Sequence, residues 1–158
     1  LHGVSVCTFL EDRKVAERQA KAASNHLKAH NLEAEIEIIN DKSNPLQKGS
    51  SLVMWAKTST GALLGGDAIG ELGKPSEIVG KEAAQNLLEE IALKATVDKH
   101  LADMMVPYVA LADASSIYLT RDMTDHLETN IWLTEKILDL RFHVTKVGEL
   151  YQIEKKGS

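Results

Sequence analysis

A histidine in the string Asp125-His126-Leu127-Glu128-Thr129-Asn130 has surroundings suited to chemistry at a ring nitrogen. Asp125 followed three residues later by Glu128 is typical of a helix start, so we expect His126 just inside a helix N-terminus. The positive end of the helix dipole disfavours the imidazolium, and a neutral ring nitrogen can act as a nucleophile or a general base. The same helix end could hold a phosphate group. A histidine that merely covers the helix start explains the pattern at least as well, so the residues alone leave both interpretations open.

A second polar pair, His100 and Asp103, lies one helical turn apart in an otherwise apolar stretch. Its simplest interpretation is a structural salt link. The surrounding segment from Leu101 to Leu140 is strongly acidic. Its seven acids, against Arg121 and Lys136, are Asp103, Asp113, Asp122, Asp125, Glu128, Glu135 and Asp139. Such a segment suits a divalent cation or a cation-bridged nucleoside triphosphate, although a solvated acidic face is a common alternative.

Two other motifs have weaker chemical meaning. The glycine-rich segment 65–74 does not match a Walker loop, because Lys74 is followed by Pro75 and the position five before Gly73 is Ala68. We therefore expect a turn that sets up the next helix rather than a phosphate loop. His26 and His30 have a spacing that can chelate a metal, but no third ligand belongs to the pattern, so we predict no metal site there.

The composition of the chain limits its class. It has 158 residues, of which 44% are hydrophobic and 26% charged, with a formal net charge of −5. These values exclude collagen-like, disordered and disulfide-scaffold proteins and argue against a free-standing nucleic-acid binder. The single Cys7 favours a reducing, cytoplasmic setting. No apolar run approaches the roughly 18 residues that span a bilayer, so we expect no membrane contact.

The elements that position these residues form two groups. The first has the order βαβββα, with strands over 3–7, 33–38, 51–56 and 62–64 and helices over 13–30 and from Pro75 to about 93. Asp12 is the expected N-cap of its first helix, and residues 40–50 are expected to form an exposed loop. The glycines at 65, 66, 70 and 73 are expected to separate the sheet from the second helix.

The second group has the order αβαββ. We expect a helix from about Ala95 that Pro107 ends or kinks, a short strand over 117–119, a helix from Asp125 and a closing hairpin over 141–147 and 150–153. This group lacks an opening strand, and the chain begins with Leu1 rather than Met. We therefore expect further sequence upstream. The predicted fold class is α+β, with a two-layer βαβββα unit followed by an incomplete αβαββ unit.

Four blocks in order along the chain resemble the C-terminal half of the RNA 3′-terminal phosphate cyclases. They are residues 73–80 (GKPSEIVG), 96–103 (TVDKHLAD), 110–112 (ALA) and 126–131 (HLETNI), and residues 15–18 resemble the family's first insert-domain helix. Four collinear blocks are far more specific than any one of them. The resemblance implies that residues 1–93 form the family's small inserted domain and residues 94–158 the end of the third repeat of its large domain.

The resemblance also implies an activity and its residues. In that family a histidine attacks the α-phosphate of ATP, and AMP passes to an RNA 3′-phosphate, which the neighbouring 2′-hydroxyl closes to a 2′,3′-cyclic phosphate. On this chain the nucleophile would be His126. The nucleotide-binding segment would be His100, Leu101, Ala102, Asp103 and Met104. ATP and a divalent cation, Mg²⁺ or Mn²⁺, would be the cofactors, and the partners would be an RNA 3′-phosphate end and the absent N-terminal half.

Two other hypotheses remain at this stage. The family usually has Gln where this chain has Met104, and a thioether cannot replace a side-chain amide. This departure motivates a non-catalytic cyclase-like scaffold for RNA processing or ribosome biogenesis. The apparent completeness of the βαβββα unit motivates a stand-alone interaction module.

Overall fold

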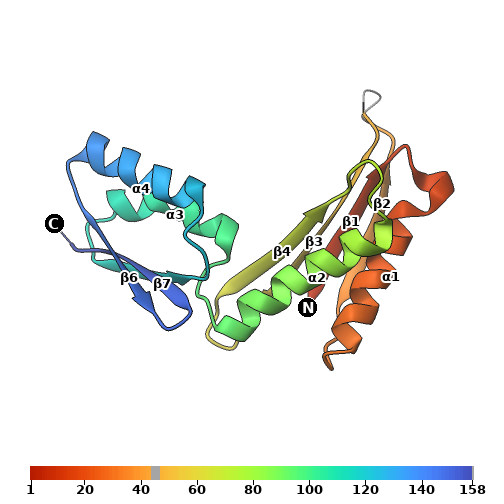
Figure 1. The fold of residues 1–158 in the computed structure, drawn as a ribbon, viewed down its shortest axis with the longest axis horizontal. Coiled ribbons are helices and arrows are strands. Elements are labelled where there is room, and N and C mark those ends of the chain that lie inside the picture. The colour runs from red at the N-terminus through yellow and green to blue at the C-terminus, as the bar shows by residue number, and fades with distance from the viewer. Residues whose placement is uncertain (44–46, 158) are drawn as a thin grey trace. The chain divides into compact units, whose positions relative to one another are not determined.

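The computed structural model describes residues 1–43 and 47–157 of the chain. Contacts between residues divide it into two compact units, Leu1–Ala92 and Leu93–Ser158. Each unit packs helices against a β-sheet, as Figure 1 shows, which confirms the predicted α+β class. No helix in the described part of the chain is long and apolar enough to cross a membrane.

The first unit has the predicted βαβββα order, with one short extra helix. Its elements are β1 (His2–Thr8), the 3-10 helix η1 (Glu11–Arg13), α1 (Val15–Lys28), β2 (Glu35–Asp41), β3 (Gly49–Lys57), β4 (Leu63–Ile69) and α2 (Ser76–Leu93). The strands lie in the order β2-β1-β3-β4, and only the β1–β2 pair is parallel. That parallel pair requires a crossover, which α1 provides.

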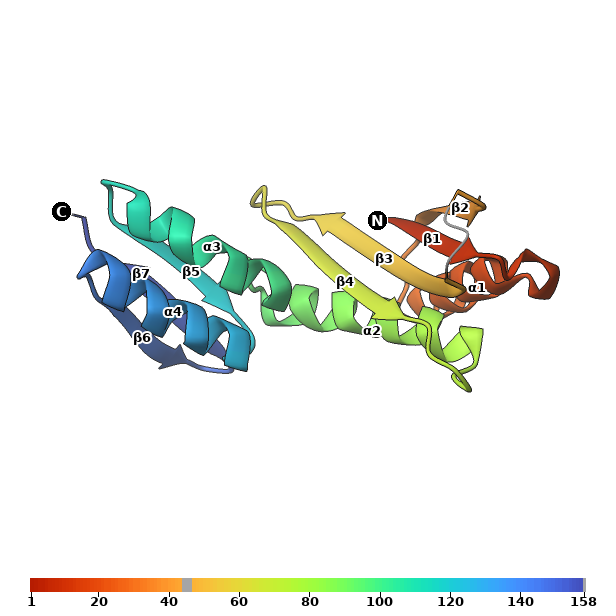
Figure 2. The same ribbon diagram turned by 90° about the horizontal axis from the view of Figure 1, so that it is seen from above.

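Both helices of this unit cover one face of the sheet (Figures 1 and 2). Alternate residues of β3, Leu52, Met54 and Ala56, are buried against them. Because side chains alternate along a strand, the intervening Val53 stays 46% exposed on the opposite face. The core of the unit therefore lies between one sheet face and two helices.

The glycine cluster is divided differently from the prediction. Gly65 and Gly66 lie inside β4, while Gly70 and Gly73 follow it. A Cβ at Gly66 would collide with the backbone of Leu87 and Ala83 on α2. Gly66 therefore lies in a strand because only a residue without a side chain allows α2 to pack so closely. Strand propensities disfavour glycine and so do not predict this position.

Asp12 is not the N-cap of α1, as the sequence predicted. It lies in η1, and the residue before α1 is Lys14, whose φ of 51° is left-handed and whose side chain makes no capping bond. Phe9, the residue after β1, is also left-handed at φ 53°. The connection between β1 and α1 therefore turns at Phe9 and Lys14 and places Asp12 inside η1 rather than at the start of α1.

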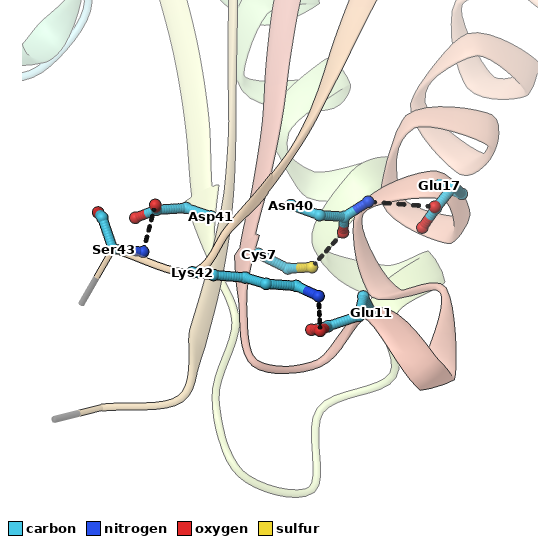
Figure 3. Close-up of polar contacts among 7 residues, drawn as sticks. All are labelled: Cys7, Glu11, Glu17, Asn40, Asp41, Lys42 and Ser43. Carbon is cyan, nitrogen blue, oxygen red and sulfur yellow. Dashed lines mark hydrogen bonds and ion pairs between the residues drawn. The ribbon is translucent and has the colours of Figure 1, made fainter. Parts of the chain in front are cut away.

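The predicted loop over 40–50 is shorter than expected. Asn40 and Asp41 complete β2 by pairing with Cys7 and Thr8 of β1. Figure 3 shows the side-chain contacts at this end of the strand, where the Cys7 thiol donates to Asn40 Oδ1 at 2.9 Å. Lys42 forms an ion pair with Glu11 at 3.0 Å. Local polar contacts thus extend a strand through residues typical of loops, and positions 44–46 of the prediction lie outside the described residues.

The second unit has the predicted αβαββ order. Its elements are α3 (Lys99–Leu111), β5 (Ser116–Thr120), α4 (Asp125–Leu138), β6 (Phe142–Val147) and β7 (Leu150–Lys155). The strands lie in the order β5-β7-β6, all antiparallel. The buried core between sheet and helices includes Val106, Leu127 and Ile153.

Pro107 does not end its helix, contrary to one of the two predicted outcomes. It lies inside α3, which continues to Leu111. Val106, Val109 and Ala110 are buried on either side of it, so tertiary packing holds the last turn in place. The missing N–H of Pro107 leaves the carbonyl of Asp103 without its usual helical donor.

Candidate functional site

The start of α4 presents His126 to solvent. Thr124 is the N-cap, with an extended ψ of 156°, and its side-chain oxygen accepts a hydrogen bond from the Leu127 N–H at 3.1 Å. Leu127 is fully buried, while His126 beside it is exposed. The cap therefore lies one residue before Asp125, and Asp125 with Glu128 forms the acidic first turn. The result is an accessible imidazole at the positive end of a helix.

The segment from His100 to Met104 forms the first turns of α3. Asp98 is the N-cap, and its carboxylate accepts from the backbone N–H groups of His100 at 3.1 Å and Leu101 at 2.8 Å. Within the segment, Ala102 is fully buried and Met104 is 63% exposed. The segment thus has one face in the core and one toward solvent.

Two consecutive carbonyls of this segment accept bonds from other elements. The Tyr118 hydroxyl on β5 donates to the Ala102 carbonyl at 2.9 Å. The Asn130 side-chain amide on α4 donates to the Asp103 carbonyl at 3.3 Å. The second bond replaces the donor that Pro107 removes from the helix. The backbone of the segment is therefore held from two sides.

Burial keeps the Tyr118 hydroxyl protonated. Tyr118 is 4% exposed, and its pKa is raised far above the usual value, first by burial and then by the charge of Asp103. A phenol in this state remains a hydrogen-bond donor across the physiological pH range. The Tyr118 hydroxyl can therefore donate to the Ala102 carbonyl at a higher pH than a free phenol could.

The two helices bring both candidate histidines to the same end of the unit. Figure 2 shows α3 and α4 side by side and running in the same direction. The Asn130–Asp103 bond sets their register. His126 precedes Asn130 by one turn and His100 precedes Asp103 by nearly one turn. Two exposed imidazoles therefore lie near the N-termini of parallel helices, an arrangement that favours an anionic ligand.

The predicted acidic surface is not one site. Glu135 accepts bonds from the Arg141 guanidinium at 3.0 Å and from the Phe142 N–H at 2.8 Å. Asp122 contacts Arg121 at 3.1 Å, and Asp139 is the C-cap of α4. Only Asp125 and Glu128 share the helix start with His126. In the parts of the chain that the structure describes, no three His, Cys, Asp or Glu side chains form a group able to hold a metal ion.

His26 lies in α1, whereas His30 follows the end of that helix at Lys28, and both have structural contacts. His26 Nε2 lies 2.9 Å from Gln85 Oε1 on α2, and His30 Nδ1 lies 2.9 Å from the carbonyl of His26. Their rings are 5.0 Å apart and tilted. The contact between His26 and Gln85 thus connects α1 to α2.

Sequence reasoning did not identify Thr124, Tyr118 or Asn130 as supporting residues. Asn130 had a signal, because Pro107 on a predicted helix implies a carbonyl without a donor. Thr124 is a favourable capping residue immediately before Asp125, so both positions were acceptable N-caps. Nothing in the sequence pointed from Tyr118 to Ala102, since that contact depends on how β5 packs under α3.

Comparison with known proteins gives a consistent result. Residues 1–92 match the family model described as the RNA 3′-terminal phosphate cyclase (RTC) insert domain. The chain is 46% identical over 145 residues to the RNA 3′-terminal phosphate cyclase of Pyrobaculum aerophilum, covering 90% of this chain and 41% of that protein. It is 42% identical over 159 residues to the protein of the same name from Pyrococcus abyssi, covering 98% of this chain and 45% of that one. The chain thus spans less than half the length of these curated relatives.

Proposed function

The chain belongs to the RNA 3′-terminal phosphate cyclase family, and we propose that it is the C-terminal part of an enzyme that converts an RNA 3′-phosphate to a 2′,3′-cyclic phosphate with ATP. The observation that carries the proposal is the exposed His126 at the capped start of α4, in a chain 42% identical over 98% of its length to a protein of that name. The proposed enzyme belongs to the ligase class and works in the cytoplasm.

The proposed reaction begins with covalent catalysis. A neutral ring nitrogen of His126 attacks the α-phosphorus of ATP, the bond to the β-phosphate oxygen breaks, and diphosphate leaves. An oxygen of the RNA 3′-phosphate then attacks the AMP phosphorus and displaces the histidine. Finally the 2′-hydroxyl attacks the activated 3′-phosphorus, loses its proton, and AMP leaves as the cyclic diester forms.

The helix start suits the first step of this sequence. The positive end of the α4 dipole attracts the triphosphate. The Thr124 cap and the buried Leu127 fix the turn that bears His126, so the nucleophile approaches from a rigid element. Positioning of this kind lowers the entropic part of a barrier.

The proposed nucleotide site is the segment His100, Leu101, Ala102, Asp103 and Met104. Tyr118 and Asn130 hold its backbone, and His100 and Met104 are exposed beside the helix ends. The carboxylates of Asp125 and Glu128 in the first turn of α4 fit a Mg²⁺ or Mn²⁺ that the triphosphate also binds. Such a cation would neutralise phosphate charge beside Asp125 and Glu128.

In our proposal, this chain needs the rest of the protein for activity. The RNA 3′-phosphate end and the N-terminal sequence present in the relatives would complete the enzyme, since the chain covers 41–45% of those proteins. The formal charge of −5 supports this division, because the cations for RNA would lie mainly on the N-terminal part.

Labelling of the full-length protein tests the proposal. With ATP labelled at the α-phosphate, the protein should acquire a label that is stable to alkali and released by mild acid, as expected of a phosphorus–nitrogen bond. His126→Ala should abolish the label, while His143→Ala, at an exposed position on β6, should leave it unchanged. No label, or label that survives His126→Ala, contradicts the proposal.

A non-catalytic cyclase-like scaffold for RNA processing is the second candidate. Met104, 63% exposed in the proposed nucleotide segment, favours it because its thioether gives the nucleotide no amide to bond. Cyclisation of a 3′-phosphorylated RNA by the full-length protein with ATP would exclude this candidate.

A further inference from the structure

The first unit contains a cavity of about 830 Å³ that the proposed reaction does not use. It lies where the β1–α1 connection, the start of β3 and the β4–α2 loop meet, so segments about 60 residues apart in sequence line it, from Leu10 to Gly73. The proposed catalytic and nucleotide-binding residues all belong to the second unit. The cavity is therefore a separate feature.

The floor of the cavity is a fixed polar network. Gln19 is fully buried, and its Nε2 donates to Ser50 Oγ at 2.8 Å. The Ser5 hydroxyl lies 2.9 Å from the Ala16 carbonyl and 3.1 Å from Gln19 Oε1, so these two acceptors share its proton. Because Ser50 Oγ accepts from Gln19, its own proton is left to donate elsewhere. The Gly70 N–H donates to the Ser50 carbonyl at 2.8 Å, which holds the β4–α2 loop against the floor.

The lining is more basic than the chain as a whole. Four of its side chains are cationic, Arg13, Arg18, Lys48 and Lys74, against two acids, Asp12 and Glu71, in a chain of net charge −5.

Two of these cations are held in place by ion pairs. Arg18 bonds Glu77 through Nε and Nη2, both at 2.7 Å, which leaves Nη1 outside that pair. Lys74 lies 2.5 Å from Glu82 and 3.7 Å from Glu71. Glu77 and Glu82 bring the number of acids to four and cancel the surplus of the lining, so the site depends on Arg13 and Lys48, which are exposed and form no ion pair within residues 1–43 and 47–157.

The cavity also adjoins the start of α2. Ser76, 8% exposed, is the first residue of that helix and lines the cavity. Its N–H belongs to a first turn, where backbone donors have no partner inside the helix, whereas the Glu77 N–H already donates to the Glu77 carboxylate. Fixed hydroxyl and backbone donors together with mobile cations are the groups that bind phosphate oxygens.

We propose that this cavity binds a backbone phosphate of an RNA strand. The naming of RNA rests on the proposed function, whereas the phosphate chemistry rests on the cavity alone. A strand is favoured over a free phosphate because Leu72, which is fully exposed and lines the cavity, offers an apolar surface that a base or ribose can cover.

Binding of a labelled single-stranded RNA with a 3′-phosphate to the 158-residue chain tests the proposal. Arg13→Ala with Lys48→Ala should weaken binding about tenfold and lower the slope of log affinity against log salt by roughly 0.7, the value for one phosphate contact on a single strand. Lys28→Ala with Lys57→Ala removes the same charge at the end of α1 and the end of β3, and should change affinity less than twofold. Equal losses in the two double variants, or no loss in the first, overturn the proposal.

Inorganic phosphate distinguishes the source of the anion. In the wild-type chain it should shift the backbone amide signals of Ser50, Gly73 and Ser76, and the RNA should displace it. Phosphate binding that RNA does not compete for would mean a site for free phosphate and would overturn the assignment to RNA. None of these measurements involves ATP or His126. If the full-length protein is inactive but the cavity binds RNA, only the proposed function is refuted. If ATP labels the protein but the cavity does not bind RNA, only this inference is refuted.

Discussion

Asn130 on α4 donates its side-chain amide to the backbone carbonyl of Asp103 on α3, the carbonyl that Pro107 leaves without a helical donor. One side chain thus compensates for a proline in the neighbouring helix and sets the register of the two helices. Because the proposed nucleophile lies on α4 and the proposed nucleotide segment on α3, the same bond would align the two halves of the candidate site.

The first prediction concerns this bond. Asn130→Ala should destabilise the second unit by about 1–2 kcal/mol, because a partly buried carbonyl loses its donor. Pro107→Ala restores an N–H that can bond Asp103, so Asn130→Ala should cost clearly less in that background. Urea unfolding of the chain, followed by the amide signals of α3 and α4, measures both values. An equal cost in the two backgrounds would show that Asn130 does not replace the missing donor.

The Tyr118 hydroxyl predicts a dependence of stability on pH. Its pKa in the folded chain is raised by burial and by Asp103, whereas in the unfolded chain it stays near the model-peptide value of about 10. The folded state therefore retains a proton that the unfolded state loses, and stability should fall as pH rises above about 10. Tyr118→Phe removes this titration, so the free-energy difference between wild type and variant should shrink from pH 9 to pH 11. A difference that is constant over this range would contradict the assignment.

Thr124 should control the helix that bears His126. Thr124→Ala removes the side-chain acceptor for the Leu127 N–H and should cost about 1 kcal/mol, while Thr124→Ser keeps the hydroxyl and should cost much less. Thermal unfolding of the chain compares the two variants. If Ser is as destabilising as Ala, the methyl group rather than the cap is responsible.

Gly66 should tolerate no side chain. Gly66→Ala places a methyl group against the backbone of Leu87 and Ala83, so the first unit should lose about 1–3 kcal/mol or more of stability. Gly49→Ala is the matched control on the neighbouring strand, because a Cβ there meets nothing within 4 Å and its φ is not left-handed. Denaturant midpoints of the two variants should differ clearly, and similar midpoints would mean that α2 can move away from β4.

These residues also show how far the sequence could predict the fold. The continuous apolar run over 51–56 and the helical stripe of α2 depend on local spacing, and both elements formed where expected, although β3 buries only one face rather than both. Gly66 and Asn40 were predicted as turn or loop residues, yet both lie in strands, because contacts with α2 and with Cys7 outweigh local propensity. Propensity rules cannot include contacts between segments distant in sequence.

In the candidate site, too, local features were predictable from the sequence and tertiary contacts were not. The exposed His126 in a first helical turn follows from the spacing of acids and apolar residues around it. The roles of Tyr118 and Asn130 follow from tertiary contacts 16 and 27 residues away in sequence. Sequence patterns therefore predicted the position of His126 at a helix start but not the side chains that hold the segment from His100 to Met104.

Met104 provides the sharpest test of how the proposed nucleotide site works. Met104→Gln introduces an amide with a donor and an acceptor, and the position is 63% exposed, so the fold should accept it at little cost in stability. In the full-length protein this variant should lower the KM for ATP severalfold, because the new amide can bond the nucleotide. Met104→Leu conserves volume without an amide and should leave KM near the wild-type value. Equal KM values for the Gln and Leu variants would show that this side chain does not face the nucleotide, and the assignment of the segment His100 to Met104 would lose its support.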